Sequence, residues 1–407
     1  MKVAFVFMHP FSESMGSVVR VRELALSLGK SGVEVYIFTP YERSFDLFPH
    51  VHVVSASSLI NTLGLSKAVY SFSKFLYYNK AFPGLFSKTE FRFNRVMANL
   101  IKGLAKLLVK KDIDIVQVEQ DAALPIGVGL KKETGLPLVV DVHNVSSEEL
   151  VAAGVLERGS DSFFALQETT KCFLSETDHV VVVSECMRDY VVRNYSLSSV
   201  RVSVVPPGGR PLIEKAVVEK RSEPVKVVYA GLVAYRERVD LFVRSMPFVR
   251  RHDGDVQFYI TNKGEAVGRI KRLANDLGVK PAFFWYDDYD AVNRFLSSCH
   301  VGVLLSSDDI ARRMGTPAKL FNYMSVGLPM VVNDNGGWTE IIKKERVGLV
   351  ASDDPEDFGE TVSSLISDTK VMREFAFNGL DLVARKYNWD VSAQVLLAAY
   401  SDLVGKS

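Results

Sequence analysis

The chain has 407 residues, 47% of them hydrophobic, which is too long for one ordinary core and suits two domains. The net charge is +1 with both signs spread along the chain, so composition gives no electrostatic case for binding nucleic acid. The odd number of widely spaced cysteines, Cys172, Cys186 and Cys299, argues against a disulfide framework or a clustered-cysteine metal site.

The N-terminus begins with a short apolar run over 3–8 that is followed at once by His9 and Pro10. This run predicts a buried first strand rather than a signal peptide. Nowhere do about 18 apolar residues run together without a charge, so no membrane-spanning helix is expected. Together with the cysteine pattern, these features predict a cytoplasmic protein.

The first strand leads through a loop to Gly16, then to a predicted helix over 18–30 and a second strand over 33–38. This order forms a Rossmann-like unit, whose ligand loops lie at the carboxyl ends of the strands. The GxGxxG signature of dinucleotide binders is missing. Gly16 is a candidate for close approach to a ligand, although a glycine can also open a helix without that role.

The segment 70–111 interleaves aromatic residues with lysines, of which Lys102, Lys106 and Lys110 recur at four-residue spacing. One interpretation is a surface that lies against anionic lipid at the inner membrane face. The other is an ordinary amphipathic helical pair, with leucines toward the sheet and lysines in water. Aromatic residues at helical spacing belong more often to a core, which favours the second interpretation.

Parallel strands are predicted to resume over 113–118 and 138–141, and the second is followed by His143, Asn144 and a helix start. A histidine just past the carboxyl end of a strand stands where open α/β sheets bind ligands. This placement makes His143 the candidate functional histidine. The other six histidines have no such context.

Three prolines and two glycines over 206–211, followed by a charged run to Glu223, mark a linker. The predicted N-terminal domain covers 1–207 and the C-terminal domain covers 208–387. Strands and helices alternate again from Val225 onward, so the predicted fold class is α/β, with two Rossmann-like doubly wound domains.

The most informative stretch is 314–337, MGTPAKLFNYMSVGLPMVVNDNGG. Thr316 is an N-cap type and Pro317 suits the first helical position, so a helix should begin here with free N–H groups that can hold an anion. Lys319 and Asn322 are three residues apart and share one face of this helix. A buried strand, a loop and a new helix with Glu340 in its first turn should follow.

The run GTPAKLFNYMSVGLPMVV, followed by GGWTEII, resembles the donor-site segment of retaining glycosyltransferases of the GT-B fold, the group 1 or family-four set. The resemblance implies two domains that face each other across a cleft, with a terminal helix over 388–407 that crosses back to the N-terminal domain. It implies a hexosyltransferase-type transfer from a nucleoside diphosphate sugar to a glycan or lipid-linked acceptor, with retention of configuration. Neither a metal nor another cofactor is expected.

The same resemblance implies roles for individual residues. His143 matches the family histidine that lies beside the transferred sugar, and Glu340 would contact the sugar's hydroxyl groups. Asn322 stands where relatives have an acidic residue that binds the ribose, and it brings no negative charge. The donor-binding residues that the resemblance implies are Gly16, Thr316, Lys319 and Asn322.

Two other family positions are altered, because the arginine and lysine that pair with the diphosphate in relatives align with Leu232 and Glu237. Arg236 and Arg238 flank the second position and could reach the same oxygens with a bidentate fork, although a solvated basic loop would have the same sequence. These changes keep two alternatives open. One is a nucleotide-sugar 2-epimerase on the same fold, and the other is a non-catalytic descendant that binds a nucleotide sugar.

Overall fold

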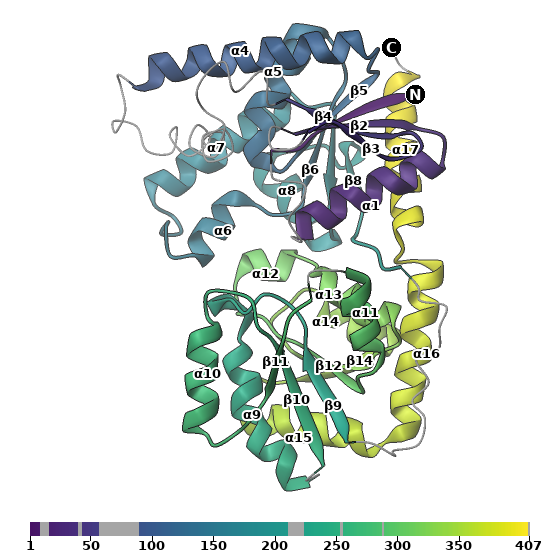
Figure 1. Ribbon diagram of the computed structural model, residues 1–407. Coiled ribbons are helices and arrows are strands. Elements are labelled where there is room, and N and C mark those ends of the chain that lie inside the picture. The colour runs from purple at the N-terminus through teal and green to yellow at the C-terminus, as the bar shows by residue number, and fades with distance from the viewer. Residues whose placement is uncertain are drawn as a thin grey trace. The chain divides into compact units, whose positions relative to one another are not determined.

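The computed structural model describes residues 1–8, 16–39, 43–56, 89–210, 224–252, 255–286 and 289–405. The chain divides into two compact units, each with its own sheet (Figure 1). Unit 1 comprises Met1–Pro206 and Trp389–Ser407, and unit 2 comprises Pro207–Asn388.

Unit 1 is built on an eight-stranded sheet, counted over the described residues, in the order β3-β4-β2-β1-β5-β6-β7-β8. The pairings are parallel except that of β3 with β4. Most of these strands are nearly continuous apolar runs, as expected for strands buried on both faces. The elements of unit 1 are β1 (Lys2–Val6), α1 (Gly16–Lys30), β2 (Glu34–Thr39), β3 (Phe45–Phe48), β4 (Val51–Ser55), α4 (Thr89–Lys110), β5 (Ile115–Glu119), η1 (Asp121–Ala123), α5 (Leu124–Thr134), β6 (Leu138–Val142), α6 (Ser146–Ala152), α7 (Asp161–Ser175), β7 (His179–Val182), α8 (Glu185–Tyr195), η2 (Ser199–Arg201), β8 (Val202–Val204) and α17 (Trp389–Val404).

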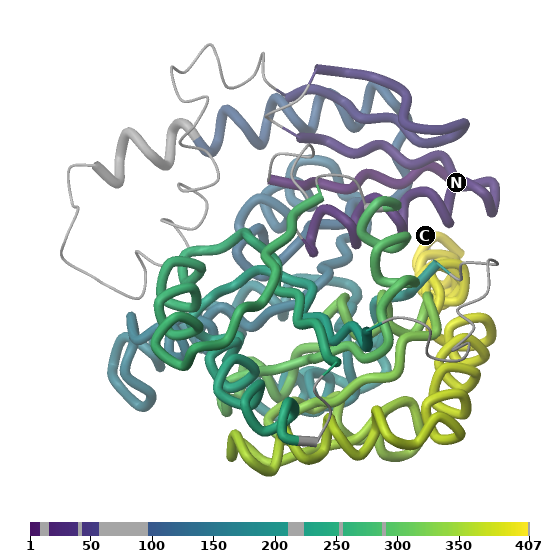
Figure 2. Tube along the Cα trace, turned by 60° about the horizontal axis from the view of Figure 1, so that its bottom comes forward, coloured from purple at the N-terminus to yellow at the C-terminus, as the bar shows by residue number. Residues whose placement is uncertain are grey.

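One face of this sheet is covered by α1 and α17, which lie side by side in both views (Figures 1 and 2). From α17, Trp389, Leu396 and Tyr400 enter the same hydrophobic core as Phe5 of β1 and Leu24 of α1. The C-terminal helix is therefore part of the core of unit 1.

On the opposite face, α5 packs against β5 and β6, and α4 packs on α5. The part of α4 with described side chains is an ordinary amphipathic helix, with leucines buried and lysines exposed. The buried leucines are Leu100, Leu104 and Leu108, and the exposed lysines are Lys102, Lys106 and Lys110. Residues 70–88, which hold most of the aromatics of the suggested lipid-facing surface, lie outside the described residues, so membrane contact stays a prediction.

Unit 2 is built on a six-stranded sheet, again counted over the described residues, in the order β11-β10-β9-β12-β13-β14, and all pairings are parallel. One face is covered by α9, α10 and α15, and the other by α11, α13 and α14. The predicted α/β fold class is confirmed. The elements of unit 2 are β9 (Val225–Tyr229), η3 (Tyr235–Glu237), α9 (Val239–His252), β10 (Val256–Thr261), α10 (Val267–Asp276), β11 (Ala282–Phe284), α11 (Tyr289–Ser297), β12 (Val301–Leu304), α12 (Ile310–Met314), α13 (Ala318–Ser325), β13 (Met330–Asn333), α14 (Thr339–Glu345), β14 (Gly348–Ala351), α15 (Pro355–Ser367) and α16 (Thr369–Arg385).

The structure also bears on the cysteines and on the expectation of no membrane-spanning helix. None of Cys172, Cys186 and Cys299 is in a disulfide bond. Among the described residues, no helix is both long enough and apolar enough to cross a membrane.

Candidate functional site

The carboxyl ends of the strands in unit 2 bring together four side chains that are distant in sequence. Tyr229 is the last residue of β9, and Glu237 lies in η3 shortly after it. Arg312 lies in α12 and Lys319 in α13. We call these four residues the Lys319 cluster, and all of them belong to unit 2.

Lys319 lies at the centre of this cluster. Its Nζ donates to the Tyr229 hydroxyl at 2.9 Å and to the Glu237 carboxylate, and it lies 4.6 Å from the centre of the Tyr229 ring. Arg312 Nη2 donates to the second carboxylate oxygen of Glu237 at 2.7 Å. One carboxylate is thus held between two cations, which leaves the cluster with an excess of one positive charge.

Burial and the neighbouring charges together determine the charge states of the cluster. Burial acts to raise the pKa of Glu237, but Lys319 and Arg312 outweigh it, so this pKa lies below the usual 4.5. Burial lowers the pKa of Lys319, and the Glu237 carboxylate offsets only part of that effect. The hydroxyl of Tyr229, buried beside Glu237, has a pKa well above 10 and stays neutral. The ammonium of Lys319 therefore depends on an anionic neighbour to stay protonated.

Local geometry gives the two cations their positions. A Cβ on Gly231 would lie 3.0 Å from Lys319 Nζ, so glycine lets the lysine side chain lie across the loop after β9. Asp309 caps α12 by accepting from the backbone N–H of Arg312 at 2.9 Å. Arg312 Nε is buried without a hydrogen-bond partner in the part of the chain that the structure describes. An unpaired guanidinium N–H in a cluster that carries a net positive charge is suited to donate a hydrogen bond to an anionic oxygen.

The start of α13 differs by one residue from the expectation. Pro317 is the N-cap, in an extended conformation with φ −72° and ψ 134°, so Thr316 is not the cap and lies just outside the helix. The prediction was wrong because the fixed φ of proline suits both an extended cap and a first helical residue. No side chain caps this end of α13, so a ligand could accept from its first N–H groups.

Arg238, one of the two arginines expected to replace the family's clamp, is paired elsewhere. It has a left-handed φ of 46°, and its Nη1 donates to Asp353 Oδ2 at 2.8 Å. Arg236 is exposed, and its main-chain carbonyl accepts from the N–H of Ser307 at 2.9 Å. The cation that contacts Glu237 besides Lys319 is instead Arg312, for which no role was predicted.

The remaining candidates of unit 2 lie on α13 and α14. Asn322 follows Lys319 by three residues and is partly buried, whereas Glu340 is exposed in the first turn of α14. A Cβ on Gly337, just before α14, would lie only 2.0 Å from the carbonyl oxygen of Arg313. This close approach holds the GGWTE segment against α12, the helix that carries Arg312.

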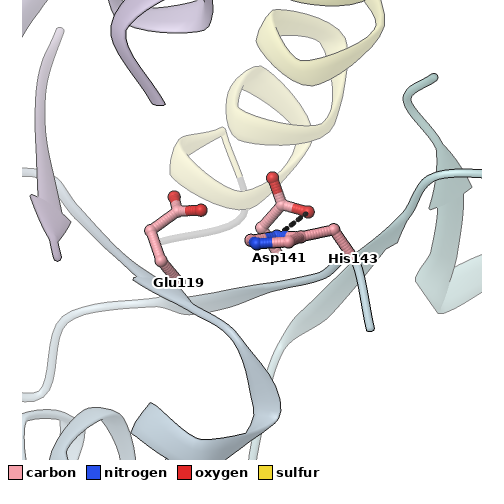
Figure 3. Close-up of side chains that lie close together, drawn as sticks. All are labelled: Glu119, Asp141 and His143. Carbon is pink, nitrogen blue, oxygen red and sulfur yellow. Dashed lines mark ion pairs between the residues drawn. The ribbon is translucent and has the colours of Figure 1, made fainter. Parts of the chain in front are cut away.

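In unit 1, the carboxyl ends of β5 and β6 hold a second group of polar side chains (Figure 3). Glu119 ends β5 and is paired in register with Asp141 of β6. Arg20 of α1 donates to both oxygens of Asp141, from Nε at 2.8 Å and from Nη2 at 3.1 Å. Figure 3 shows the ring of His143 beside Asp141, and we call Arg20, Glu119, Asp141 and His143 the His143 cluster.

The two candidates of unit 1 lie in different surroundings. The His143 side chain is 10% exposed, and its Nδ1 lies 3.9 Å from Asp141 Oδ1, beyond hydrogen-bonding distance. Both ring nitrogens are buried without a partner among the described residues. Gly16 is the exposed first residue of α1, and no described atom lies within 4 Å of the place where a Cβ would be. Packing therefore does not explain the glycine at this position.

The His143 cluster also offers possible metal ligands. Glu119, Asp141 and His143 each present one ligand atom, and these atoms lie within 4.8 Å of one another. The fit to a divalent cation is poor, because both oxygens of Asp141 already accept from the Arg20 guanidinium and the ion would lie beside that charge. We therefore assign no metal to this cluster.

Comparison with known proteins gives matches across both units. A model described as Glycosyltransferase Family 4 matches residues 15–209, and one described as Glycosyl transferases group 1 matches residues 224–368. An uncharacterized glycosyltransferase of Methanocaldococcus jannaschii is 25% identical over 291 residues, which cover 68% of this chain and 72% of the relative.

Solved structures match over the whole length. Sucrose-phosphate synthase from Thermosynechococcus elongatus has a TM-score of 0.76 at 17% identity, with 100% of both chains covered. The E. coli trehalose-6-phosphate protein bound with UDP-2-fluoro glucose has a TM-score of 0.68 at 13% identity, with 99% of both chains covered. At these identities the structural matches concern the fold.

Proposed function

We propose a donor and a course of reaction for this chain, which is a glycosyltransferase of the GT-B fold. The proposed donor is a nucleoside diphosphate sugar, from which a hexosyl group moves to a glycan or lipid-linked acceptor with retention of configuration. The observation that carries the proposal is the Lys319 cluster, in which Lys319 and Arg312 are held around Glu237 at the start of α13.

The cluster suits a diphosphate leaving group. When the bond between the anomeric carbon and the diphosphate oxygen breaks, negative charge builds on that oxygen and must be stabilised. Lys319 and Arg312 supply two cations, and the first N–H groups of α13 add partial positive charge. Arg312 Nη2 keeps its bond to Glu237, and the charge of the guanidinium would stabilise the diphosphate. These groups would do the work of a metal ion, so we propose metal-independent transfer.

The sugar side of the reaction is assigned to His143 and Glu340, on the resemblance of the segments around them. A neutral imidazole can donate from one nitrogen and accept at the other, which suits a sugar hydroxyl. The exposed carboxylate of Glu340 can accept from further hydroxyls. Asn322 would hydrogen-bond the ribose as a neutral group. The acceptor oxygen would attack the face that the diphosphate leaves, without a protein nucleophile, and its proton would pass to the departing diphosphate.

The choice of donor class can be tested by a thermal-shift screen of nucleoside diphosphate sugars. Selective binding should stabilise the folded protein by about 2.7 kcal/mol at a 100-fold excess over Kd. The fold match to the E. coli protein bound with UDP-2-fluoro glucose makes uridine diphosphate sugars the first set to try. A screen in which no nucleotide sugar shifts the melting temperature would count against the donor assignment.

Turnover of substitution variants tests the assigned roles. Lys319→Ala should lower kcat by roughly 100-fold, the size of effect seen when a transition-state donor is removed, and His143→Ala should lower it clearly as well. Lys344→Ala, an exposed lysine on α14, is the matched control and should leave turnover unchanged. A loss of no more than a few-fold for both of the first two variants would contradict the mechanism.

Product analysis separates the alternatives. The anomeric configuration of the product, read by NMR, decides between retention and inversion. Conversion of the donor to an epimer without any acceptor would indicate a 2-epimerase instead. Donor binding without turnover across many acceptors would indicate a non-catalytic descendant.

A further inference from the structure

The His143 cluster holds two buried carboxyl groups side by side. Glu119 and Asp141 are register partners on adjacent parallel strands, and they are 3% and 0% exposed. Arg20 gives both Nε and Nη2 to Asp141. The groups that face Glu119 are Asp141 from β6, Arg20 from α1 and the neutral hydroxyl of Tyr400 from α17, with His143 close by. Two adjacent buried carboxylates beside one guanidinium are costly to keep ionised together, so one of them should hold a proton.

The hydrogen bonds indicate which carboxyl group holds the proton. Tyr400 donates its hydroxyl hydrogen to Gln117 Oε1 at 2.5 Å, and Gln117 Nε2 donates to Glu119 Oε1 at 2.8 Å. Glu119 Oε2 is buried and has no partner in the described part of the chain. Burial and the charge of Asp141 raise the pKa of Glu119 to about 8, whereas the Arg20 guanidinium holds the pKa of Asp141 below 3.8 against the effect of burial. The proton therefore belongs on Glu119, and Oε2 is the oxygen free to carry it.

An ionised Asp141 also constrains the neighbouring imidazole. His143 Nδ1 is the ring nitrogen close to Asp141, at 3.9 Å from Oδ1. A carboxylate only accepts hydrogen bonds, so the ring is more stable with its hydrogen on Nδ1. Nε2 is then left as an acceptor, and it has no partner among the described residues.

We propose that Asp141 is a positioning residue that holds the ring hydrogen of His143 on Nδ1, and that Glu119 carries a proton so that Asp141 alone keeps the negative charge. Arg20 fixes the orientation of Asp141 with its bidentate fork. The inference deepens the proposed function and rests on it for its consequence. That consequence is that Nε2 of His143 accepts a hydrogen bond from a hydroxyl of the transferred sugar.

Nitrogen NMR of the full-length protein without ligand tests the tautomer directly. His143 of the wild type should carry its hydrogen on Nδ1, and Asp141→Asn should shift the ring toward the Nε2–H form. The matched control is Asp46→Asn, because Asp46 Oδ1 lies 2.6 Å from Nδ1 of His52 in the same unit. That change should affect His52 and leave His143 as it was.

Two results would overturn the inference. One is a wild-type His143 with its hydrogen on Nε2, and the other is the same tautomer in wild type and Asp141→Asn. If the single variant fails to fold because Arg20 is left unpaired, the double variant Arg20→Gln with Asp141→Asn removes both charges. It should show the same shift of the His143 tautomer.

Infrared titration tests the proton on Glu119. The wild type should show the band of a protonated carboxyl group at neutral pH that disappears as pH rises through about 8, and Glu119→Gln should abolish this band. In Asp141→Asn the band should disappear at lower pH, because the charge of Asp141 is gone and the Arg20 guanidinium is free to stabilise ionised Glu119. A band that persists in Glu119→Gln, or no band in the wild type, would refute the assignment.

Steady-state kinetics separates this inference from the proposed function. Asp141→Asn should lower kcat at least tenfold with the donor KM within twofold, because ring orientation matters most in the transition state. An altered tautomer with wild-type turnover would support the positioning role but contradict the contact between His143 and the sugar. Reduced turnover with an unaltered tautomer would overturn the positioning role and leave the proposed function standing.

Discussion

Glu237 sets the positive charge that an incoming anion meets in the Lys319 cluster. Its side chain is 13% exposed and lies between Lys319 and Arg312. Removing one partner of a buried ion pair leaves an uncompensated charge, which typically costs about 3–5 kcal/mol. The carboxylate therefore stabilises unit 2 when no ligand is bound, and a bound diphosphate would share the same two cations.

Glu237→Gln should lower the stability of the unliganded protein and increase the stabilisation that a nucleoside diphosphate provides. We expect a loss of about 3 kcal/mol in the free energy of unfolding, measured with urea. A saturating nucleoside diphosphate should restore more stability in the variant than it adds to the wild type, because its anion replaces the missing carboxylate. Glu356→Gln is the control, since it removes an exposed pair with Arg251 and should cost less than about 1 kcal/mol. Equal ligand effects in variant and wild type would argue against diphosphate binding by Lys319 and Arg312.

Glu119 should make the stability of unit 1 depend on pH. Its pKa rises from 4.5 to about 8 on folding, mainly through burial, so between these values the folded state holds more protons than the unfolded state. The free energy of unfolding should therefore fall as pH rises through this window, by about 1.4 kcal/mol per pH unit for this one group. The contribution is complete below 4.5 and lost above about 8. Asp141, whose pKa is lowered, acts in the opposite sense and only below about 3.8.

Unfolding by urea at about pH 5.5 and about pH 7.5 measures this effect. The wild type should lose more stability between the two conditions than Glu119→Gln, which has no proton to release. Glu133→Gln changes an exposed carboxylate of the same unit and should keep the wild-type dependence. Identical pH dependence in wild type and Glu119→Gln would show that Glu119 is not protonated in the folded state.

Sequence reasoning could select some site residues and not others, for a physical reason. Lys319 lies in a local pattern at the start of a helix and His143 in one at the end of a strand, and the sequence displays both directly. Arg312 contacts Glu237 across 75 residues of sequence, and Tyr400 contacts Gln117 across 283. Such pairs arise only when folding brings the elements together. The signal that could have found Arg312 was the acidic residue at 237, because a buried carboxylate needs compensating cations.

At the scale of elements, burial decided what could be predicted. Strands that are buried on two faces, such as β1, β2, β5 and β6, stand out as apolar runs and were predicted, whereas β4 and β14 were not. The edge strand β3 was not predicted, since three of its four residues are exposed and it pairs antiparallel on one side only. The predicted start of α13 differs from the observed start by one residue, because proline suits two positions at a helix terminus.

The contact between α12 and the loop before α14 yields a prediction for Gly337. Gly337→Ala would place a Cβ 2.0 Å from the Arg313 carbonyl oxygen, so α12 or the loop must move. We expect a loss of about 1–3 kcal/mol in stability, typical of overpacking, together with weaker binding of the donor because α12 carries Arg312. Thermal unfolding and calorimetry measure the two effects.

Gly268→Ala is the matched control for this change. The nearest atom to a Cβ there is Arg272 Nη1 at 3.7 Å, and the residue lies within α10. Alanine is favoured over glycine in a helix by up to about 1 kcal/mol, so this variant should be neutral or more stable. Unchanged donor binding in Gly337→Ala would show that the position of α12 does not matter for the donor.

At the scale of the whole molecule, the chain forms two units, of which only one is a continuous segment of the sequence. Unit 2 is a continuous segment, whereas unit 1 combines the N-terminal half with α17 at the other end. The hydroxyl of Ser392 in α17 donates to the carbonyl of Pro206 at 2.8 Å, so the two segments of unit 1 also meet where they leave unit 2. The core of unit 1 is complete only when the last residues of the chain have joined it.

Leu396 tests whether the two units unfold separately. Its side chain is fully buried in the core of unit 1, so Leu396→Ala should destabilise that unit by about 2–5 kcal/mol through lost burial and a cavity. Hydrogen exchange followed by mass spectrometry should then show faster exchange in β1, β2 and α1 and no change in β9 or β12. Val395→Ala, at a neighbouring position that is 37% exposed, should leave both patterns as in the wild type. Each unit has its own core, so one need not unfold with the other. Faster exchange in both units to the same extent would contradict this and mean that the chain unfolds as one cooperative body.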